Sequence, residues 1–493
     1  MIRFLLNDQL QGLDGVAPSL SVLQYLRTMI VRTGTKEGCA AGDCGACTVV
    51  VGELIDDALH YKAVNSCITP VGTLHGKQLI TVEHLQTDAG LHPVQQAMVD
   101  CHGSQCGFCT PGIVMSLFAW WQQIRQGTGN ADRHGVEIAL SGNLCRCTGY
   151  APIVRAAEQS LSIDGADTLG AQRELVIAQL QSLHGEPGQL TSGSQQFVVP
   201  DSSQAVARLL AAHPQAQLVA GATDLGLEFT QQLKQPDMLI YTGNVKELNA
   251  LEETDGALII GGAVTYSRLQ PLLQGHFPAF AQLLDRLGSL QIRNQGTLGG
   301  NVANASPIGD TPPVLLALNA RVNLHSDGGS RSIPIESFFT GYRKTVMAPG
   351  EFIESIVIPK LQDGDVLRVY KISKRFDDDI SAVCLALWLQ FEGDIVTAVR
   401  IGCGGMAATP ARAFKTEQAL LGRPFDAAAV TAARQALAED FSPIDDVRAS
   451  AAYRIAVAGN LLTRARLERE GAVDVNLFSA NHESSVSGGV HHA

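Results

Sequence analysis

Eight of the eleven cysteines of this chain fall into two compact sets. The first set reads C-x4-C-x2-C with a fourth cysteine twenty residues further on, which is the spacing of plant-type [2Fe–2S] ligands. The second set combines C-x2-C with C-x-C. We therefore predict two [2Fe–2S] clusters that carry single electrons. The predicted ligands are Cys39, Cys44, Cys47 and Cys67 for the first cluster, and Cys106, Cys109, Cys145 and Cys147 for the second.

A structural zinc site is the alternative for these cysteines. Zinc sites usually pair two short C-x2-4-C hairpins, whereas here three thiols lie within nine residues. Glycines fill the loop that carries them, at Gly38, Gly42 and Gly45, and a loop that approaches a cluster closely needs such bare backbone. The spacing favours iron–sulfur over zinc. The remaining three cysteines are predicted to be small buried residues: Cys101, Cys384 and Cys403.

Composition limits the class of protein. A length of 493 residues predicts three to four domains, and 45% hydrophobic residues provide ample core. The net charge of -12 argues against a nucleic-acid partner. No apolar run reaches the roughly 18 residues of a membrane span, and the N-terminus shows no apolar signal segment. We expect a cytoplasmic chain without a membrane partner, in which clustered thiols are metal ligands rather than disulfides.

The residue pattern changes several times along the chain. It begins with short apolar strands and one helix, for which Ser21 is a plausible N-cap. Amphipathic helical periodicity follows, then a polar segment, then alternating strands and helices, and finally strands followed by helices. The predicted segments are 1–83, 84–162, a linker with a weak central helix at 163–192, 193–367, 368–475, and a tail at 476–493 that we expect to be disordered.

Two glycine-rich segments stand in the fourth of these regions. Leu218–Glu228 reads LVAGATDLGLE, and Gln295–Asp310 reads QGTLGGNVANASPIGD. Backbone N–H groups in such turns can hold a pyrophosphate, although neither segment is the GxGxxG of a Rossmann fold and plain turns are the alternative. Downstream of two clusters the pair favours a flavin, because a flavin exchanges either one or two electrons. By composition alone, Ser373–Ile380 (SKRFDDDI) reads as a solvated loop.

Taken together, these motifs resemble the small, iron–sulfur and FAD-carrying subunits of bacterial xanthine dehydrogenases, within the molybdenum hydroxylase family. The resemblance covers about residues 1–475. It rests on EGCAAGDCGACTV, NSC, HGSQCGFCTPG and GNLCRCTGY around the cysteines, and on LVAGATDLG, GTLGGNVANASPIGD, FFTGYRKT and GCGGMAATPAR further on. Clusters and flavin segments on one chain indicate the xanthine branch, because several other members carry these parts on separate chains.

The resemblance implies a multidomain α+β fold. It places a β-grasp [2Fe–2S] ferredoxin domain at 1–83 and an all-α [2Fe–2S] domain at 84–162. An α/β FAD-binding domain of the PCMH/vanillyl-alcohol-oxidase type would follow at 193–367, and an α+β C-terminal domain on the FAD/NAD side at 368–475.

The resemblance also implies which residues bind cofactors. One loop would wrap the FAD pyrophosphate, further residues would contact FAD, and a tyrosine with a charged loop would border the nicotinamide of NAD+. Leu287 stands where vertebrate relatives place a phenylalanine over the flavin, and Gln105 would face the molybdopterin of a partner. The loop residues are Leu218, Val219, Ala220, Gly221, Ala222, Thr223, Asp224 and Leu225; the further FAD residues are Thr297, Gly300, Asn301 and Asp310; the NAD+ residues are Tyr342 and, within the loop Lys374–Asp379, Lys374, Asp378 and Asp379.

The implied function is electron transfer during oxidation of hypoxanthine and xanthine to urate. Electrons would come from a molybdopterin-binding large subunit, in an α2β2 assembly, and pass through the helical-domain cluster, the plant-type cluster and FAD to NAD+. No residue of this chain would hydroxylate the purine. Two alternatives stay open: the same role in a molybdenum hydroxylase that acts on an aldehyde or an N-heterocycle, and a self-contained iron–sulfur flavoprotein that oxidises NADH.

Overall fold

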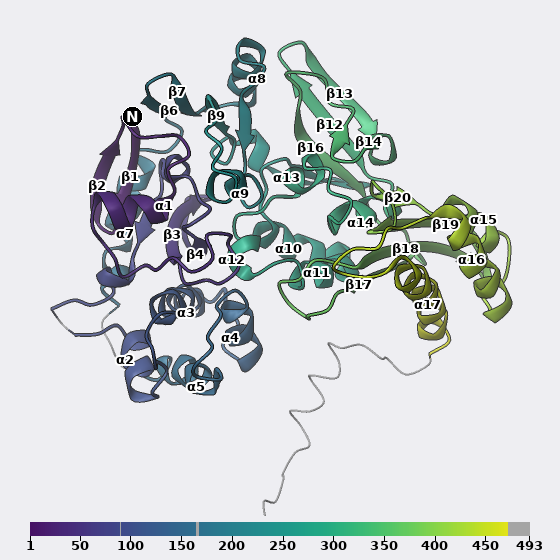
Figure 1. Ribbon diagram of the computed structural model, residues 1–493, viewed down its shortest axis with the longest axis horizontal. Helices are drawn as coiled ribbons and strands as arrows, with labels where there is room; N and C mark the ends of the chain where they lie inside the picture. The colour runs from purple at the N-terminus through teal and green to yellow at the C-terminus, as the bar shows by residue number, and fades with distance from the viewer. Residues whose placement is uncertain (89, 164–166, 472–493) are drawn as a thin grey trace, which may run out of the picture.

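In the computed structural model of the chain, which describes residues 1–88, 90–163 and 167–471, four folded units follow one another from purple to yellow (Figure 1). The first and helical units lie on the left of the view, and the C-terminal unit lies on the right. The predicted tail at 476–493 lies outside the described residues.

The first unit is a five-stranded sheet with the order β2-β1-β5-β3-β4. Its two hairpins turn at Asn7 and at Asp56–Asp57, where φ lies between 49° and 62°, the left-handed conformation that tight hairpin turns require. Ser21 caps the helix as predicted, because its hydroxyl accepts the N–H of Gln24 at 3.1 Å. The elements are β1 (Ile2–Leu6), β2 (Gln9–Leu13), α1 (Val22–Gln24), the π-helical turn η1 (Tyr25–Met29), β3 (Thr48–Ile55), β4 (Ala58–Asn65), β5 (Gln78–Ile80), and the 3-10 turns η2 (Val71–Leu74) and η3 (Val82–His84).

The helical unit packs against one face of this sheet and shares its core. The central helix is buried along most of its length, with Trp120 and Trp121 at 3% and 0% exposure, and its side chains meet Val50 and Leu59 of the sheet in one cluster. The chain therefore fixes the two cysteine-bearing units against each other through apolar burial. The helices are α2 (Pro93–Asp100), α3 (Thr110–Arg125), α4 (Arg133–Leu140) and α5 (Ala151–Ser160).

The segment predicted as a linker with a weak central helix, 163–192, contains that helix and more regular structure where it is described. Helix α7 (Arg173–Gln181), which follows the short α6 (Thr168–Ala171), buries Val176 and Leu180 in the core of the helical unit. The segment ends in strand β6 (Gly188–Ser192), which pairs with the next strand of the third unit. Buried apolar side chains at helical spacing therefore tie most of this polar stretch to the domains on either side.

The third unit has two lobes. Lobe A carries the sheet β6-β7-β9-β8, in which β7, β9 and β8 run parallel, and lobe B carries the antiparallel sheet β10-β11-β16-β12-β13. Lobe A contains β7 (Gln195–Val199), α8 (Ser203–Ala212), β8 (Gln217–Val219), α9 (Leu225–Thr230) and β9 (Met238–Tyr241). Lobe B contains η4 (Glu247–Asn249), β10 (Leu251–Glu253), β11 (Ala257–Gly261), α10 (Tyr266–His276), α11 (Pro278–Asp285), α12 (Leu290–Arg293), α13 (Leu298–Ala303), α14 (Thr311–Ala317), β12 (Arg321–Ser326), β13 (Gly329–Pro334), η5 (Ile335–Ser337) and β16 (Phe352–Pro359), with the small hairpin β14 (Phe339–Gly341) and β15 (Lys344–Thr345).

The C-terminal unit is an antiparallel sheet, β17-β18-β19-β20, covered by helices. Ala411–Arg412 pairs with β19, and the first of these helices begins at Phe414. This sequence of units confirms the multidomain α+β fold class. No helix in the described part of the chain is long and apolar enough to cross a membrane. The elements are β17 (Val366–Ile372), β18 (Val383–Glu392), β19 (Ile395–Gly404), β20 (Ala411–Arg412), α15 (Phe414–Leu420), α16 (Ala427–Asp440) and α17 (Ala451–Arg469).

Candidate functional site

The first four predicted ligands converge beside the sheet of the first unit. The thiol of Cys39 is hydrogen-bonded to those of Cys44 and Cys67, and Cys47 is hydrogen-bonded to Cys67. These two bonds from Cys44 and Cys67 lower the pKa of Cys39. Its sulfur also accepts backbone N–H groups two and four residues later, at 3.3 and 3.4 Å. Four convergent thiols with amides directed at a sulfur suit the donor set of a [2Fe–2S] cluster.

The second four ligands form two pairs at the surface of the helical unit. Cys109 is the residue before α3 and contacts Cys145, while Cys106 contacts Cys147 in the turn before α5. Burial, with a smaller contribution from Cys145, raises the pKa of Cys109 to about 12. Among the described residues, no group of three or more His, Cys, Asp and Glu side chains is arranged to hold a metal ion. Ligation by the full cysteine sets therefore stays a prediction.

A buried polar junction joins the two cysteine loops to the third unit. Asn143 donates to the carbonyl of Gly45 at 3.1 Å and accepts from Ser116 at 2.7 Å and from Gln291 at 2.9 Å. The next backbone N–H along the chain donates to the carbonyl of Cys44 at 3.0 Å. Sequence reasoning missed this junction, although a serine inside the apolar run of α3 is a signal for a buried polar contact.

The predicted pyrophosphate loop, Leu218–Leu225, joins the end of β8 to the start of α9. At Gly221 a Cβ would lie 2.0 Å from the carbonyl oxygen of Gln295, so only glycine fits. Ala222 has a φ of +59°, a left-handed conformation that is uncommon for a residue with a side chain. The loop thus crosses directly over the second glycine-rich segment. This close crossing brings together two sequence segments that we predicted separately.

The second glycine-rich segment forms α13 and its approach. The hydroxyl of Thr297 caps this helix by accepting the N–H of Gly300 at 2.9 Å. Asn301 accepts from the hydroxyl of Thr311 at 2.6 Å. These polar side chains of lobe B lie near the loop of lobe A, and such a cradle fits the phosphates and ribityl chain of FAD. Contact of each predicted residue with FAD stays a prediction.

Asp310 forms a buried ion pair that the sequence did not reveal. Its carboxylate accepts from Lys371 Nζ at 2.6 Å and from Ser381 Oγ at 2.5 Å. The side chains of Asp310 and Lys371 are only 7% and 3% exposed. Lys371 belongs to β17, so the pair bridges lobe B and the C-terminal unit. A lone lysine between Tyr370 and Ile372 in an apolar strand was the available signal, because buried lysines are nearly always paired.

The charged loop predicted to border NAD+ lies beside the first cysteine loop. Burial and the neighbouring Asp43 raise the pKa of Asp378 to about 6, and Asp43 lies within that cysteine loop. Lys374 Nζ ties the loop to the carbonyl of Val447 at 2.8 Å, and within the loop Asp379 accepts the backbone N–H of Arg375 at 2.8 Å. The structure therefore brings segment 374–379 next to the predicted plant-type cluster.

Three further predicted residues occupy different surroundings. Leu287 is partly buried against the core of lobe B. Tyr342 is 64% exposed beyond β14, and Gln105 is exposed beside Cys106. Their contacts with flavin, nicotinamide and molybdopterin stay predictions.

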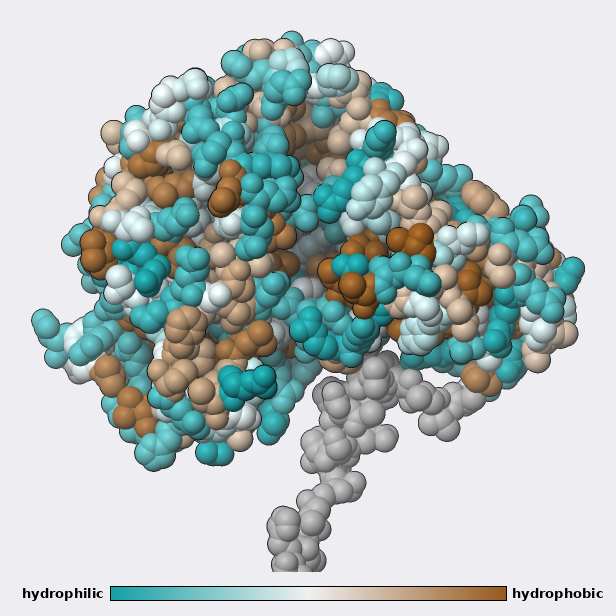
Figure 2. All heavy atoms as spheres, in the orientation of Figure 1, coloured by the Kyte–Doolittle hydropathy of each residue, from teal (hydrophilic) through white to brown (hydrophobic). Residues whose placement is uncertain are grey.

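A hollow separates the two lobes of the third unit. Figure 2 shows the surface recessed between the part that carries α8 and α9 and the part that carries β12 and β16. A cavity of about 820 Å³ also borders the predicted FAD segments at Ala220, Gly221 and Thr297. Its other walls come from the first unit, from residues after α7 and from lobe B. The other predicted FAD residues do not line this cavity.

Four family models match the chain in succession. They are a 2Fe-2S iron-sulfur cluster binding domain at 5–72, a [2Fe-2S] binding domain at 81–158, an FAD binding domain in molybdopterin dehydrogenase at 192–361 and a CO dehydrogenase flavoprotein C-terminal domain at 368–469. These matches confirm the presence of 2Fe-2S binding and FAD-binding domains, and they favour iron–sulfur over zinc for the cysteines.

Curated relatives and solved structures agree with these models. Xanthine dehydrogenase of Emericella nidulans is 34% identical over 90% of this chain and 36% of its own length, and xanthine dehydrogenase 1 of Arabidopsis thaliana is 32% identical over 83% and 35%. The chain spans about a third of the length of these relatives. Carbon monoxide dehydrogenase from Hydrogenophaga pseudoflava is 29% identical with a TM-score of 0.52, over 54% of this chain and 94% of that one. Quinoline 2-oxidoreductase from Pseudomonas putida 86 is 27% identical with a TM-score of 0.52, over 56% and 96%.

Proposed function

This chain belongs to the molybdenum hydroxylase family, and from that premise we propose that it is the electron-transfer component of an NAD+-dependent xanthine dehydrogenase. It would receive electrons from a molybdopterin-binding partner subunit during oxidation of hypoxanthine or xanthine to urate. When bound, the [2Fe–2S] clusters exchange single electrons and FAD exchanges one or two.

The observation that carries this proposal is the contact between the predicted cofactor loops. The backbone N–H beside Asn143 donates to the carbonyl of Cys44, and Asn143 itself bonds Gly45 and Gln291. Gln231, at the end of α9, donates to the carbonyls of Cys39 and the following residue at 3.3 and 3.0 Å. Hydrogen bonds within this chain thus hold both cysteine loops and helix α9 in fixed relative positions, as electron transfer between their cofactors requires.

An exposed apolar surface around the second cysteine set supports a partner subunit. Phe108 and Leu144 are 48% and 56% exposed, and they flank the exposed Cys106 and Cys147. Exposed apolar side chains next to a predicted cofactor are typical of an interface. We propose that the molybdopterin-binding subunit covers this surface in an α2β2 assembly, with Gln105 facing the molybdopterin.

The proposed acceptor, NAD+, would bind beside segment 374–379. That segment lies next to Asp43, so a nicotinamide there would be near both the flavin and the first cysteine loop. We propose a cytoplasmic location, where the eight ligand thiols would stay reduced.

The substrate of the whole assembly is a separate question. The two curated relatives described above are xanthine dehydrogenases, which supports a purine, whereas the likeness to quinoline 2-oxidoreductase supports an N-heterocycle. Activity of the purified complex with hypoxanthine, quinoline and a panel of aldehydes would distinguish the two. Turnover of hypoxanthine alone supports the purine proposal, and turnover of quinoline without hypoxanthine contradicts it.

An anaerobic NADH titration of the purified chain tests the acceptor. We expect bleaching of both the flavin band and the cluster absorbance in the visible spectrum, because the loops that hold them are in contact. The matched control is Lys415→Gln, an exposed change in the C-terminal unit, which should bleach equally. A bound flavin that NADH does not reduce would contradict NAD+ as the acceptor. Copurified molybdenum would contradict the self-contained NADH reductase.

A further inference from the structure

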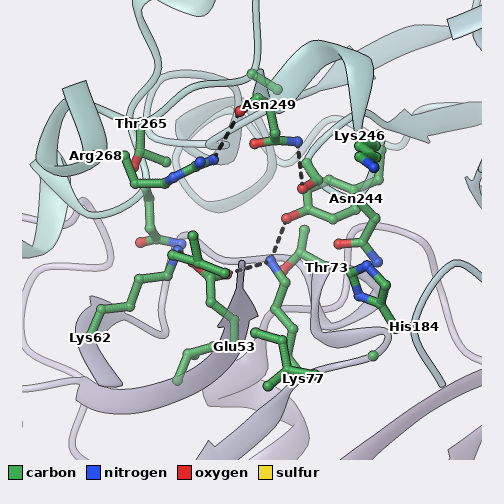
Figure 3. A pocket seen from close by; sticks show the side chains of 18 of the residues that line it. Glu53, Lys62, Thr73, Lys77, His184, Asn244, Lys246, Asn249, Thr265 and Arg268 are labelled. Carbon is green, nitrogen blue, oxygen red and sulfur yellow. Dashed lines mark hydrogen bonds and ion pairs between the residues drawn. The ribbon is translucent and has the colours of Figure 1, made fainter. Parts of the chain in front are cut away.

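The cavity of about 820 Å³ described above lies where the first unit meets the third, and we call it the interdomain cavity. Its volume falls within the range of small-molecule and cofactor sites, about 300–1,000 Å³. Figure 3 shows its side chains converging from several elements: Lys62 and Arg268 lie on one side, and Lys246 and His184 lie on the other. Three parts of the chain that are distant in sequence, within 51–77, 181–185 and 220–297, therefore line the interdomain cavity.

One wall is a fixed charge cluster. Glu53 of β3 forms ion pairs with Lys62 of β4 and with Lys77, the latter at 3.2 Å. Burial raises the pKa of Glu53, but the two lysines outweigh it and bring that pKa to about 2. Lys77 also donates to the hydroxyl of Tyr241 at 2.8 Å. One carboxylate shared by two ammonium groups leaves a positive excess on this wall.

The other cations of the cavity have no acidic partner. Arg268 donates to the carbonyl of Asn249 at 3.1 Å, and neither it nor Lys246 forms an ion pair with any described residue. The lining carries four Lys and Arg side chains against three acidic ones, two of which, Asp56 and Asp57, are exposed at the hairpin turn. In a chain of net charge -12, such a local positive excess attracts anions.

One side chain of the lining carries a buried acceptor that has no partner within the described ranges. Gln295 donates through Nε2 to Thr69 Oγ1 at 2.8 Å, but its Oε1 is buried without a hydrogen-bond donor among the described residues. Buried polar atoms are normally paired. This oxygen is not accessible from the cavity, so the class of ligand is argued from the charge and the volume of the cavity.

We propose that the interdomain cavity binds a free, phosphate-bearing ligand of nucleotide size. Lysine and arginine are the side chains that hold phosphate oxygens, and the volume exceeds the need of phosphate alone. The ligand is separate from the predicted flavin, because Leu287, Asn301 and Asp310 lie outside the lining. The cavity still shares Ala220, Gly221 and Thr297 with the predicted FAD segments, so the ligand would lie against the start of that loop, while Ala222–Leu225 lie outside the lining.

Calorimetric titration of ADP into the full, cofactor-loaded chain tests this proposal, with inorganic pyrophosphate as a second probe that lacks the base. The variants Lys246→Gln and Arg268→Gln each remove one unpaired cation of the cavity. Lys415→Gln is the matched control outside it. Loss of a charge-assisted phosphate contact should weaken ADP binding about tenfold or more. We expect one ADP site, weaker pyrophosphate binding, normal binding by Lys415→Gln, and an unchanged flavin-to-protein ratio.

Several outcomes would overturn the proposal. One is the lack of saturable ADP binding, and another is unchanged affinity in the Lys246→Gln chain, which should fold because Lys246 is exposed. Loss of ADP binding in Tyr342→Ala would move the ligand to the nicotinamide site. Release of flavin in proportion to ADP would assign the cavity to the phosphates of FAD. Each of these results can occur whether or not NADH reduces the chain, so the test is independent of the proposed function.

Discussion

The buried pair between Asp310 and Lys371 should be a main contributor to the stability of the joint between lobe B and the C-terminal unit. Lys371→Met removes the ammonium and keeps the length and apolar stem of the side chain. The carboxylate of Asp310, 7% exposed, would then keep the hydroxyl of Ser381 as its hydrogen-bonded side chain and Arg286 as a charged neighbour that forms no ion pair with it. A buried carboxylate that loses its counter-charge is costly, because desolvation is no longer offset.

The magnitude follows from the geometry. At 2.6 Å and an effective dielectric constant of about 20, the two charges attract by about 6 kcal/mol. Desolvation cancels much of this attraction in the intact pair, but removing one partner typically costs about 3–5 kcal/mol. Lys415→Met is the control: it breaks the exposed pair with Glu439, at 3.2 Å, and should cost at most about 1 kcal/mol.

Urea unfolding followed by tryptophan fluorescence measures the difference. Trp388 lies in β18 opposite Leu367 of β17, the strand that also carries Lys371, whereas the other two tryptophans, Trp120 and Trp121, lie in the helical unit. The transition of the C-terminal unit should move to lower urea in Lys371→Met. If this variant loses no more free energy of unfolding than Lys415→Met does, the pair is not stabilising in the way we argue.

Four further predictions concern the cofactor loops and the interdomain cavity. Cys44→Ala should remove one of two iron–sulfur signals in electron paramagnetic resonance because it removes one ligand, and two unchanged signals would show the ligand assignment to be wrong. Tyr342→Ala should reduce turnover with NAD+ more than turnover with an artificial dye; equal losses would mean that the side chain only packs. Asn143→Ala should cost about 1–3 kcal/mol in thermal unfolding, because it leaves buried partners unpaired, and a loss below about 0.5 kcal/mol would argue against the junction. The pKa of Glu53 falls from 4.5 to about 2 on folding, so its contribution of about 3 kcal/mol to the free energy of unfolding is present above pH 4.5 and is lost as the pH falls towards 2. In Glu53→Gln the free energy of unfolding should therefore depend less steeply on pH over that window. An unchanged pH dependence would contradict the lowered pKa.

The cysteine spacing predicted more of this protein than any other feature. A short-range pattern suffices there, because three ligands lie within nine residues and the glycines between them reveal the loop. The helix cap at Ser21 was predictable for the same reason: capping depends on residues only three positions apart. The loop Leu218–Leu225 was also visible locally, as an apolar strand followed by a turn.

Contacts between distant segments were not predictable from the pattern. Lys371 meets Asp310 across 61 positions, and Gln291 meets Asn143 across 148. Neither contact can be predicted from a periodic pattern in the sequence, because each one depends on how whole units pack against each other. The interdomain cavity belongs to the same class, since Glu53 and Arg268 lie in different domains. Segment 163–192 was predicted as a polar linker with a weak central helix, but not the packing of that helix, which depends on the burial of Val176 and Leu180 in the core of the helical unit.

The tether between Gln231 and the first cysteine loop has a consequence for biosynthesis. The side chain that holds the carbonyls of Cys39 and Ala40 is made 192 and 191 residues after them. At about 5–20 residues per second on the ribosome, that interval is about 10–40 s. During this time the loop can pack against the sheet of the first unit, but helix α9 and Gln231 have not yet been made. The nascent chain therefore presents the first four thiols before Gln231 can bond the loop that carries them. In that interval the machinery that delivers iron and sulfide can reach the loop from the side that α9 later covers.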